Sequence, residues 1–522
     1  MAPKGKRFLK KPTPLHQKTR AVPEGCLTGN LDHDSNALKQ LIRDAGDLEY
    51  RLVYTQGHRH VALFYYADMV NLTLVSRGII HPLQQCAQEL DIAHIAQSLL
   101  NVPAYKQARE LARLAEALAE GSVVLLFQGL AEALILGVSQ IEHRVIERSE
   151  SEDVLMGPHE SFSEQLGRNL ALMRSRLATP AFKNKFITLG KVSRSKVAVM
   201  FIDGIVSEDL VAEVEERLLR IDIDYISGAG HVSELLSDEP TAVLPLLRIT
   251  ERPSRVAGAL MEGRVVVLAD GDPSAIIIPT FAAEYLQSSE DYLERPAIAS
   301  FLRFIRFGGL IISVFLPGLW HALVSFHHGI IPPPLFNSIV AGREGVPLPT
   351  VVEMIVLLLT YDIIVEASTR MPMRIGQALG IVGGIILGQA AVQAGLVSPA
   401  MVIIVSLTGL STFTQPSVSI LGPLRLLKYP MLVASSIFGL FGLMWALVFM
   451  VLQVVSMRSF GYPFMYPLAP FRWRGELDIF IRIPLFWLSK RPDLLAGQNQ
   501  QRMNITPPYP GKGEQDGQSR KS

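Results

Sequence analysis

The sequence predicts an α/β duplicated cytoplasmic head followed by an all-α polytopic membrane domain with four to five membrane helices. Three observations predict this class. The first 300 residues read as an ordinary water-soluble chain, and long apolar stretches follow between residues 301 and 457. Within the head, two apolar runs occur twice in the same order. The hydrophobic fraction of 49 % and the mean hydropathy of +0.28 are higher than in most soluble enzymes.

The repeated runs of the head are short and apolar, and the second pair of runs ends in glycine. Residues 61–70 resemble residues 197–206, and residues 120–129 align without a gap on residues 262–271. Such runs are typical of buried strands and hairpin turns, and the periodic stretches between them are typical of amphipathic helices. The sequence therefore predicts two related α/β subdomains.

The segments around these subdomains have a different character. The first 20 residues carry seven basic and no acidic side chains, so this arm either lies against anionic lipid or is a solvated tail. One apolar helical face follows the first subdomain and predicts a helix connecting the copies. The predicted division is a basic disordered arm (1–47), α/β subdomain 1 (48–150), a connecting helix (151–181), α/β subdomain 2 (182–296), a transmembrane domain (297–460), a juxtamembrane cytoplasmic segment (461–491) and a disordered tail (492–522).

The sequence lacks the signatures of several function classes. A net charge of +1 gives no global field that would attract nucleic acid. Walker A, zinc-protease and nucleophile-elbow motifs are missing, and the Gly-Ala-Gly at 228–230 indicates a plain turn. Two cysteines and scattered histidines do not form a metal-ligand pattern. We therefore expect neither an enzyme nor a cofactor, and no nucleic-acid partner.

Four apolar stretches are long enough to cross a bilayer, which takes about twenty apolar residues. These stretches are residues 307–326, 375–397, 401–421 and 431–457. Arg303 and Arg306 flank the first one on the head side, which places the head in the cytoplasm by the positive-inside tendency. No apolar signal-peptide segment follows the basic arm, which supports the same location.

A fifth apolar stretch, residues 351–367, is shorter and contains Glu353, Asp362 and Glu366. Carboxylates are unfavourable against lipid, so these side chains are expected to face protein, water or the membrane interface. If the segment crosses, the basic C-terminal segment lies on the far side from the head. If the segment lies in the interface or re-enters, both ends are cytoplasmic.

The stretch 375–397 combines small and amide side chains. The glycines at four-residue spacing are Gly380, Gly384 and Gly388, and the glutamines are Gln377, Gln389 and Gln393. Glycines at this spacing form a close-packing face. Around a symmetry axis such a helix lines a narrow hydrated path, and a tight helix pair with buried amides explains the pattern equally well. In the following stretch, residues 411–416 interrupt the helix, either as a site lined by protein or water or as a proline kink.

Several motifs fall in order along residues 48–473. They include Gly157-Pro-His-Glu, Thr250-Glu-Arg-Pro253, Glu262-Gly-Arg264, Arg343-Glu-Gly-Val-Pro347 and Gly380-Ile-Val-Gly-Gly384. Together they resemble the A subunit of GerA-type spore germinant receptors, in the GerA/SpoVAF family. The chain departs from the family pattern at His159, where arginine is more usual, and at Gln128-Gly129 in the first copy.

This resemblance implies a multi-pass protein of the inner membrane of the endospore, with its head in the spore core. It implies a B subunit that resembles amino-acid transporters and senses the nutrient, and a C subunit that is a lipoprotein. It further implies a homo-oligomeric ring that conducts ions when nutrient binds and so triggers germination. A non-conducting scaffold that relays the state of its partner and a transporter with a site at 412–416 are the alternatives.

Within a channel, the carboxylates Glu353, Asp362 and Glu366 are candidates for attracting cations, by the logic of charged rings in cation pathways. The three glutamines, with the glycine face, are candidates for the pore lining. These assignments rest on residue type and spacing in the apolar stretches.

Overall fold

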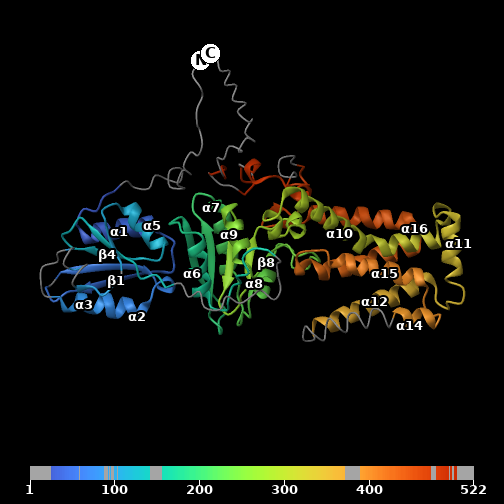
Figure 1. Cartoon of the computed structure of the whole chain (residues 1–522), viewed down its shortest axis with the longest axis horizontal. Coiled ribbons are helices and arrows are strands. Elements are labelled where there is room, and N and C mark those ends of the chain that lie inside the picture. The colour runs from blue at the N-terminus through green and yellow to red at the C-terminus, as the bar shows by residue number, and fades with distance from the viewer. Residues whose placement is uncertain are drawn as a thin grey trace, which may run out of the picture.

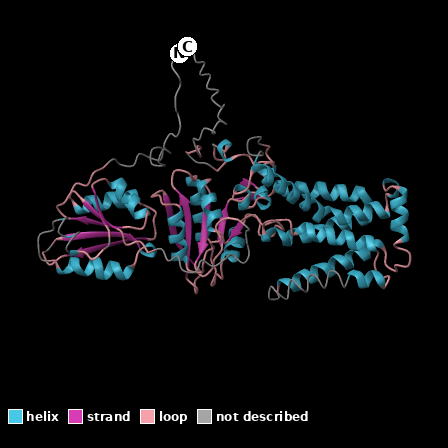
Figure 2. Cartoon of the chain, viewed as in Figure 1, coloured by secondary structure: helices cyan, strands magenta, loops and turns pink. Residues whose placement is uncertain are grey.

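The computed structural model describes residues 25–57, 59–86, 104–140, 156–370, 388–471 and 478–488, with a few further residues between 92 and 102 and up to 502. The two α/β units follow one another along the long axis of the molecule, and the helical part lies beyond the second unit (Figure 1). Figure 2 shows helices alone at that far end. Residues 1–24 of the basic arm, Gln377, Gly380 and Gly384 fall outside the described residues.

Each α/β unit contains an antiparallel sheet of five described strands. The first has the order β1-β2-β4-β5-β3, and the second has the order β6-β7-β9-β10-β8. The strands of the first are β1 (Leu48–Tyr54), β2 (His60–Tyr66), β3 (Tyr105–Ala108), β4 (Val123–Phe127) and β5 (Ala133–Leu136). Those of the second are β6 (Phe182–Leu189), β7 (Ser195–Ile202), β8 (Arg248–Thr250), β9 (Val265–Ala269) and β10 (Ala275–Ile278).

The strand register confirms the predicted duplication. In the first copy Val123 pairs with Leu136, and in the second Val265 pairs with Ile278, so both partners are shifted by 142 residues. The pair Ala108 with Ala133 recurs as Thr250 with Ala275 at the same shift. The repeat seen in the sequence therefore preserves hydrogen-bond partners as well as residue types.

Helices cover both faces of each sheet. In the first copy, α1 (Leu31–Leu41) and α5 (Leu111–Ala119) pack on one face, and the π-helical η3 (Val75–Ile80) with α3 (His81–Gln85) packs on the other, with α2 (Leu72–Leu74) preceding them. In the second copy, α6 (Leu166–Arg176) and α9 (Pro253–Met261) take one face, and α7 (Glu208–Leu219) and α8 (Ala229–Leu236) take the other.

The first helix of each copy bears on the predicted division of the chain. Residues 1–47 are predicted to be disordered, but α1 lies within them, begins at the N-cap Asn30 and buries Leu38 completely. Residues 151–181 are predicted to hold a helix between the copies, and α6 lies there, packed under the sheet of the second copy as α1 packs under that of the first. Each copy therefore begins with a helix that packs under its own sheet.

The helical part contains α10 (Pro296–Ser325), α11 (Pro333–Ala341), α12 (Thr350–Thr369), α14 (Gly388–Gln393), α15 (Pro399–Thr412) and α16 (Leu421–Ser456), with the 3₁₀ turns η7 (His328–Ile330) and η9 (Val418–Ile420). By length and composition, the segments Pro296–Ser325 and Val418–Ser456 are the two described helices that could cross a membrane. The interruption predicted at residues 411–416 is present, because α15 ends at Thr412 within the apolar stretch 401–421. Pro416 disfavours helical backbone at the residue before it and so separates α15 from α16.

The long apolar helix α16 folds back on itself at Gly439, which has φ 59° and ψ −138°. A Cβ atom on Gly318 of α10 would lie 3.0 Å from both Met431 O and Leu443 Cδ1. In a straight helix residues 431 and 443 would be about 18 Å apart along the axis. The predicted single span 431–457 therefore contains the turn of a helical hairpin, whose arms are residues 421–438 and 440–456.

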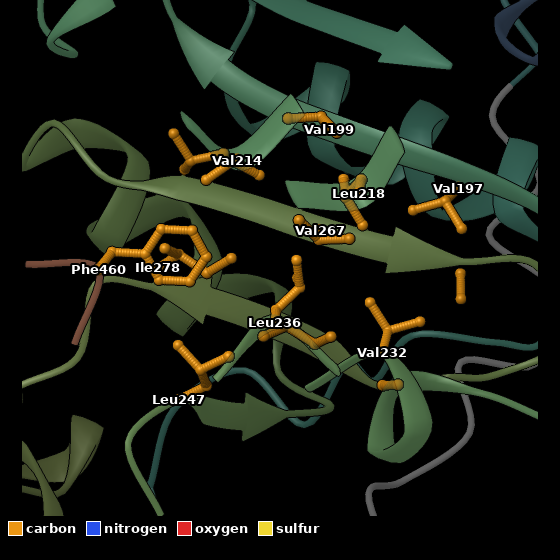
Figure 3. Close-up of a cluster of buried hydrophobic side chains, with 14 of the residues drawn as sticks. Val197, Val199, Val214, Leu218, Val232, Leu236, Leu247, Val267, Ile278 and Phe460 are labelled. Carbon is orange, nitrogen blue, oxygen red and sulfur yellow. The ribbon is translucent and has the colours of Figure 1, made fainter. Parts of the chain in front are cut away.

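The chain that follows this hairpin packs on the head. The short strands β11 (Arg458–Ser459) and β12 (Tyr462–Pro463) hold Phe460, which enters the apolar cluster of the second copy. Figure 3 shows Phe460 beside Ile278 in that cluster. Ser459 Oγ donates to Leu246 O at 2.8 Å and accepts from Thr280 N at 3.1 Å. The C-terminal segment thus packs directly against the second copy of the head.

Part of the predicted disordered tail is also packed. Leu495 is 1 % exposed and lies in a small cluster with Phe281 and Tyr466. Arg491 donates to the backbone carbonyls of Met261, at 2.7 Å, and of Gln501, at 2.6 Å. The tail beyond residue 502 is outside the described residues.

Candidate ion pathway and head junction

Glu353 is the most buried of the three carboxylates on α12, with 0 % of the residue exposed. Its Oε1 accepts hydrogen bonds from Ser398 N at 2.6 Å and Ser398 Oγ at 2.7 Å, at the start of α15. Its Oε2 has no hydrogen-bond partner among the described residues and lies 3.7 Å from Arg343 Nη2. Glu353 therefore ties α12 to α15 at the end of the bundle that is remote from the head.

Asp362 lies further along α12 and contacts α16. Its Oδ1 accepts from Lys428 Nζ at 2.9 Å, and its Oδ2 accepts from Tyr429 Oη at 2.6 Å. Lys428 is only 3 % exposed, so the ammonium group depends on this carboxylate for compensation. The sequence does not reveal a basic partner for Asp362, because Lys428 is 66 residues away in the chain.

Glu366 is exposed and pairs with Arg370 one turn later, at 2.7 Å. With Asp362 it borders a cavity of about 620 Å³ between α12 and the first arm of α16. Arg370 and Arg425 also line this cavity, and Leu359, Ile363 and Leu426 supply its apolar wall. We call this cavity the α12–α16 groove.

The three predicted carboxylates do not form one group. Asp362 and Glu366 are four residues apart and share a face, whereas Glu353 is nine residues from Asp362 and points to the opposite side of the helix. Gln389 and Gln393 lie exposed on α14. Gly388 packs closely, because a Cβ atom there would lie 3.4 Å from Val402 Cγ1 of α15. The other two glycines and Gln377 fall outside the described residues.

A second polar cluster lies where α10 leaves the head. Arg303 and Asp291 are 2 % and 1 % exposed, and Arg303 Nε donates to Asp291 Oδ2 at 3.0 Å. Arg306 Nη1 donates to both carboxylate oxygens of Asp291, at 2.8 and 2.9 Å. From the sequence these two arginines are expected to be flanking charges of a membrane segment. In the structure both pair with the buried Asp291, Arg303 as a buried side chain and Arg306 as a partly buried one.

The C-terminal segment joins this cluster through Asp478. Arg303 Nη1 donates to the Asp478 backbone carbonyl, and Tyr292 Oη donates to Asp478 Oδ2 at 2.6 Å. Burial, together with the nearby Asp478 carboxylate, raises the pKa of the Tyr292 hydroxyl well above its usual value. We call Asp291, Tyr292, Arg303, Arg306 and Asp478 the junction cluster. It connects the second copy, α10 and the chain after α16. The participation of Asp478, which is 175 residues from Arg303, is not among the sequence predictions.

Comparison with known proteins places this arrangement in a family. The profile of the Bacillus/Clostridium GerA spore germination proteins matches residues 36–494. This chain belongs to the GerA family. The family resemblance seen in the motifs is thereby confirmed.

The relatives of this GerA-family chain are similar over most of their length. Spore germination protein KA of Bacillus subtilis (strain 168) is 35 % identical over 451 residues, which are 86 % of this chain and 83 % of that protein. Spore germination protein B1 of the same organism is 33 % identical over 473 residues, covering 89 % and 97 %. GerLA of Bacillus cereus is 32 % identical over 474 residues, covering 90 % and 96 %.

One solved structure is similar to the N-terminal half of this GerA-family chain. It is the crystal structure of the N-terminal domain of the A subunit of the Bacillus megaterium spore germinant receptor GerK3. The two are 24 % identical with a TM-score of 0.40, over 49 % of this chain and 96 % of that one.

Proposed function

We propose that this GerA-family chain is the A subunit of a spore germinant receptor and forms an oligomeric, nutrient-gated cation channel that triggers germination. The protein is multi-pass in the inner membrane of the endospore, with its head in the spore core. It acts with a transporter-like B subunit, which senses the nutrient, and with a lipoprotein C subunit. Family membership and the similarity to spore germination proteins over most of the chain support the receptor role.

The observation that carries the channel proposal is the α12–α16 groove. Asp362, Glu366 and two arginines lie on its walls between apolar helices, and the groove is open on one side. Charged side chains are unfavourable against lipid and normally face protein or water. The open side of the groove must therefore face another copy of the chain or a water-filled pore. This favours an oligomer that is arranged around such a pore.

The ion pairs in the groove suggest how such a channel is gated. In this arrangement Lys428 neutralises Asp362 and Arg370 neutralises Glu366. A carboxylate that is already paired attracts cations weakly, so we assign this arrangement to a closed state. Nutrient binding shifts the equilibrium toward a state in which these pairs separate and the carboxylates face the ion path. Gln389, Gln393 and the segment with Gln377 and Gly380 remain our candidates for the lining.

The hairpin of α16 bears on topology. Helix α10 leaves the head, and the second arm of α16 returns to it, so an even number of crossings connects them. The head and the C-terminal segment then share the core side of the membrane. By length alone the acid-bearing helix α12, with 20 residues, also suits a crossing, although its three carboxylates set it apart from the two helices that qualify by composition as well.

The test is ion flux in liposomes that contain the chain with its B and C partners. We expect nutrient to release cations from such vesicles. The double variant Asp362→Leu/Lys428→Met removes both charges together, so that neither is left buried alone, and we expect it to lower the nutrient-dependent flux at least tenfold. The control is Glu216→Leu/Arg220→Met, which removes an exposed acid–base pair of the head, and we expect it to leave the flux unchanged.

Two other outcomes distinguish the alternatives. Vesicles that stay electrically silent with every partner present contradict conduction and favour a scaffold that relays the nutrient signal. Saturable solute uptake favours a transporter. The break after α15 fits a transport site poorly, because Gln415 Nε2 already donates to Arg306 O at 2.8 Å near the junction cluster.

A further inference from the structure

The duplicated fold places a cavity at the same position in each copy of the head, against the helix α5 or α9 and the two neighbouring strands. The cavity of the first copy has about 430 Å³, and that of the second has about 400 Å³. Equivalent residues line both, shifted by 142 positions. The matching side chains are Lys106, Arg113 and Ser122 in the first copy and Arg248, Arg255 and Arg264 in the second.

The two cavities differ in charge. Lys106 and Arg113 balance Glu116 and Glu120 in the first copy. The second cavity has five basic side chains, Arg248, Arg252, Arg255, Arg264 and Arg502, against the acids Glu262 and Glu284. The described lining of the second cavity therefore has three more positive than negative charges. Since the fold is the same, this excess comes from four arginines of the second copy and from Arg502 of the C-terminal segment.

The two acids of the second cavity contact two of its five basic side chains. Arg264 lies 2.6 Å from Glu284 and 3.2 Å from Glu262, and Arg502 lies 4.0 Å from Glu262. Arg248 is 3 % exposed and gives one hydrogen bond, from Nη1 to Glu284 O at 2.5 Å. Arg248 Nε and Nη2 and Arg264 Nε are buried without a partner among the described residues. Buried guanidinium donors without acceptors are unfavourable and are normally matched by an anion.

We propose that the cavity of the second copy binds a small anion that carries a phosphate or carboxylate group. Arginine presents its N–H groups in a planar fork that fits such oxygens in pairs. Ser254 and Ser288 add hydroxyl groups to the wall, and Tyr292 and Leu485 give it an apolar side. A volume of about 400 Å³ is that of a small-molecule site.

The anion would contact three parts of the chain at once. Helix α9 and strand β10 belong to the second copy, η6 (Ser289–Tyr292) leads into α10, and Leu485 and Arg502 belong to the C-terminal segment. Three of the motifs that carry the family resemblance also meet here, through Pro158, Arg252 and Arg264. A bound anion therefore stabilises the docking of the C-terminal segment next to the junction cluster.

The experiment is thermal unfolding of the purified full chain in lipid-free detergent, titrated with inorganic phosphate at constant ionic strength. We expect phosphate to raise the Tm of the wild type. The variants Arg255→Ala and Arg502→Ala change partly exposed side chains, so the fold should survive, which far-UV circular dichroism checks. We expect each of these two variants to need at least ten times more phosphate than the wild type to reach half of the maximal rise in Tm. The matched control Arg113→Ala, at the equivalent place in the first copy, should leave this amount unchanged.

A second arm identifies the source of the anion. The same proteins are placed in nanodiscs of phosphatidylcholine with or without phosphatidylglycerol, in phosphate-free buffer. Stabilisation by phosphate in detergent indicates a free anion, and stabilisation by phosphatidylglycerol alone, lost in Arg255→Ala, indicates a lipid headgroup. The proposal is overturned if neither phosphate nor phosphatidylglycerol raises the wild-type Tm, or if Arg113→Ala weakens the response as much as Arg255→Ala.

Discussion

At the scale of single residues, one guanidinium group joins the two copies of the head. Arg174 of α6 has a side chain that is 1 % exposed, and it donates from Nε and Nη2 to Asp47 at 2.6 and 2.5 Å. Its plane lies 3.7 Å from the centre of the Tyr66 ring, and Nη2 also donates to Asn184 at 3.1 Å. Asp47 and Tyr66 belong to the first copy and Arg174 to the second. Lysine cannot reproduce this combination of paired and stacked contacts.

We expect Arg174→Met to lower the free energy of unfolding of the full chain by about 3–5 kcal/mol, because it leaves Asp47 buried without its partner. Denaturant unfolding in detergent, followed by intrinsic fluorescence, measures the loss. Arg220→Met is the control, since its pair with Glu216 is exposed, and it should change stability by less than about 1 kcal/mol. Equal effects of the two variants would contradict the role of Arg174.

At the scale of elements, the hairpin of α16 depends on one glycine. Gly439 has a positive φ of 59°, and a Cβ atom there would lie 2.9 Å from His327 Cε1 and 3.0 Å from Phe326 Cβ. The left-handed backbone and the close approach to the end of α10 both exclude a larger side chain. The sequence does not reveal this, because Gly439 lies in an unbroken apolar run where a glycine is equally compatible with a continuous helix.

We expect Gly439→Ala to destabilise the helical part by about 1–3 kcal/mol, through strain at positive φ and contact with Phe326. The matched control is Gly422→Ala in the same helix, where no atom lies within 4 Å of the added methyl group. That change should be neutral or slightly stabilising, because alanine favours helix. The thermal unfolding of both variants in detergent is the measurement, and a Gly439→Ala protein as stable as Gly422→Ala would argue against the hairpin.

The elements also show which parts of the structure the sequence could predict. The repeated runs in the sequence predict the two copies of the α/β unit. Val123 and Val265 lie in equivalent strands, and each strand pairs with a strand that is close to it in the sequence. The sequence also shows the acidic residues of α12, but it does not show their hydrogen-bond partners. Lys428 reaches Asp362, and Ser398 reaches Glu353, only because the helices pack together. The packing of described residues between 458 and 495 on the head is also not among the sequence predictions. Contacts between segments separated by the whole helical part leave no periodic pattern in the sequence.

At the scale of the whole molecule, the junction cluster couples the head, the first helix and the C-terminal segment. Asp291 receives hydrogen bonds from both Arg303 and Arg306, and Asp478 brings the chain after α16 to the same point. A rotation of α10 against the head would have to break several buried charge-assisted bonds together. Such a coupled set suits a device with two discrete states.

We expect Arg303→Met to release the C-terminal segment, because Asp478 loses its cationic partner and Asp291 loses one of two. Hydrogen exchange followed by mass spectrometry should show residues 478–488 exchanging at least tenfold faster in the full chain. Arg370→Met, which removes an exposed pair on α12, should leave this exchange unchanged. Unaltered protection of residues 478–488 in Arg303→Met would show that the cluster does not hold the segment.

The insertion of Phe460 into the second copy also sets an order on biosynthesis. This ring completes an apolar cluster built from residues 189–278, yet the ribosome adds it only after every described helix of the membrane part. A nascent chain translated only as far as α12 therefore leaves an unfilled apolar site beside Ile278. Chaperones and proteases that act on exposed apolar surface could use this site to recognise chains whose insertion is incomplete. The second copy of the head thus reports on whether the helical part that follows it has been completed.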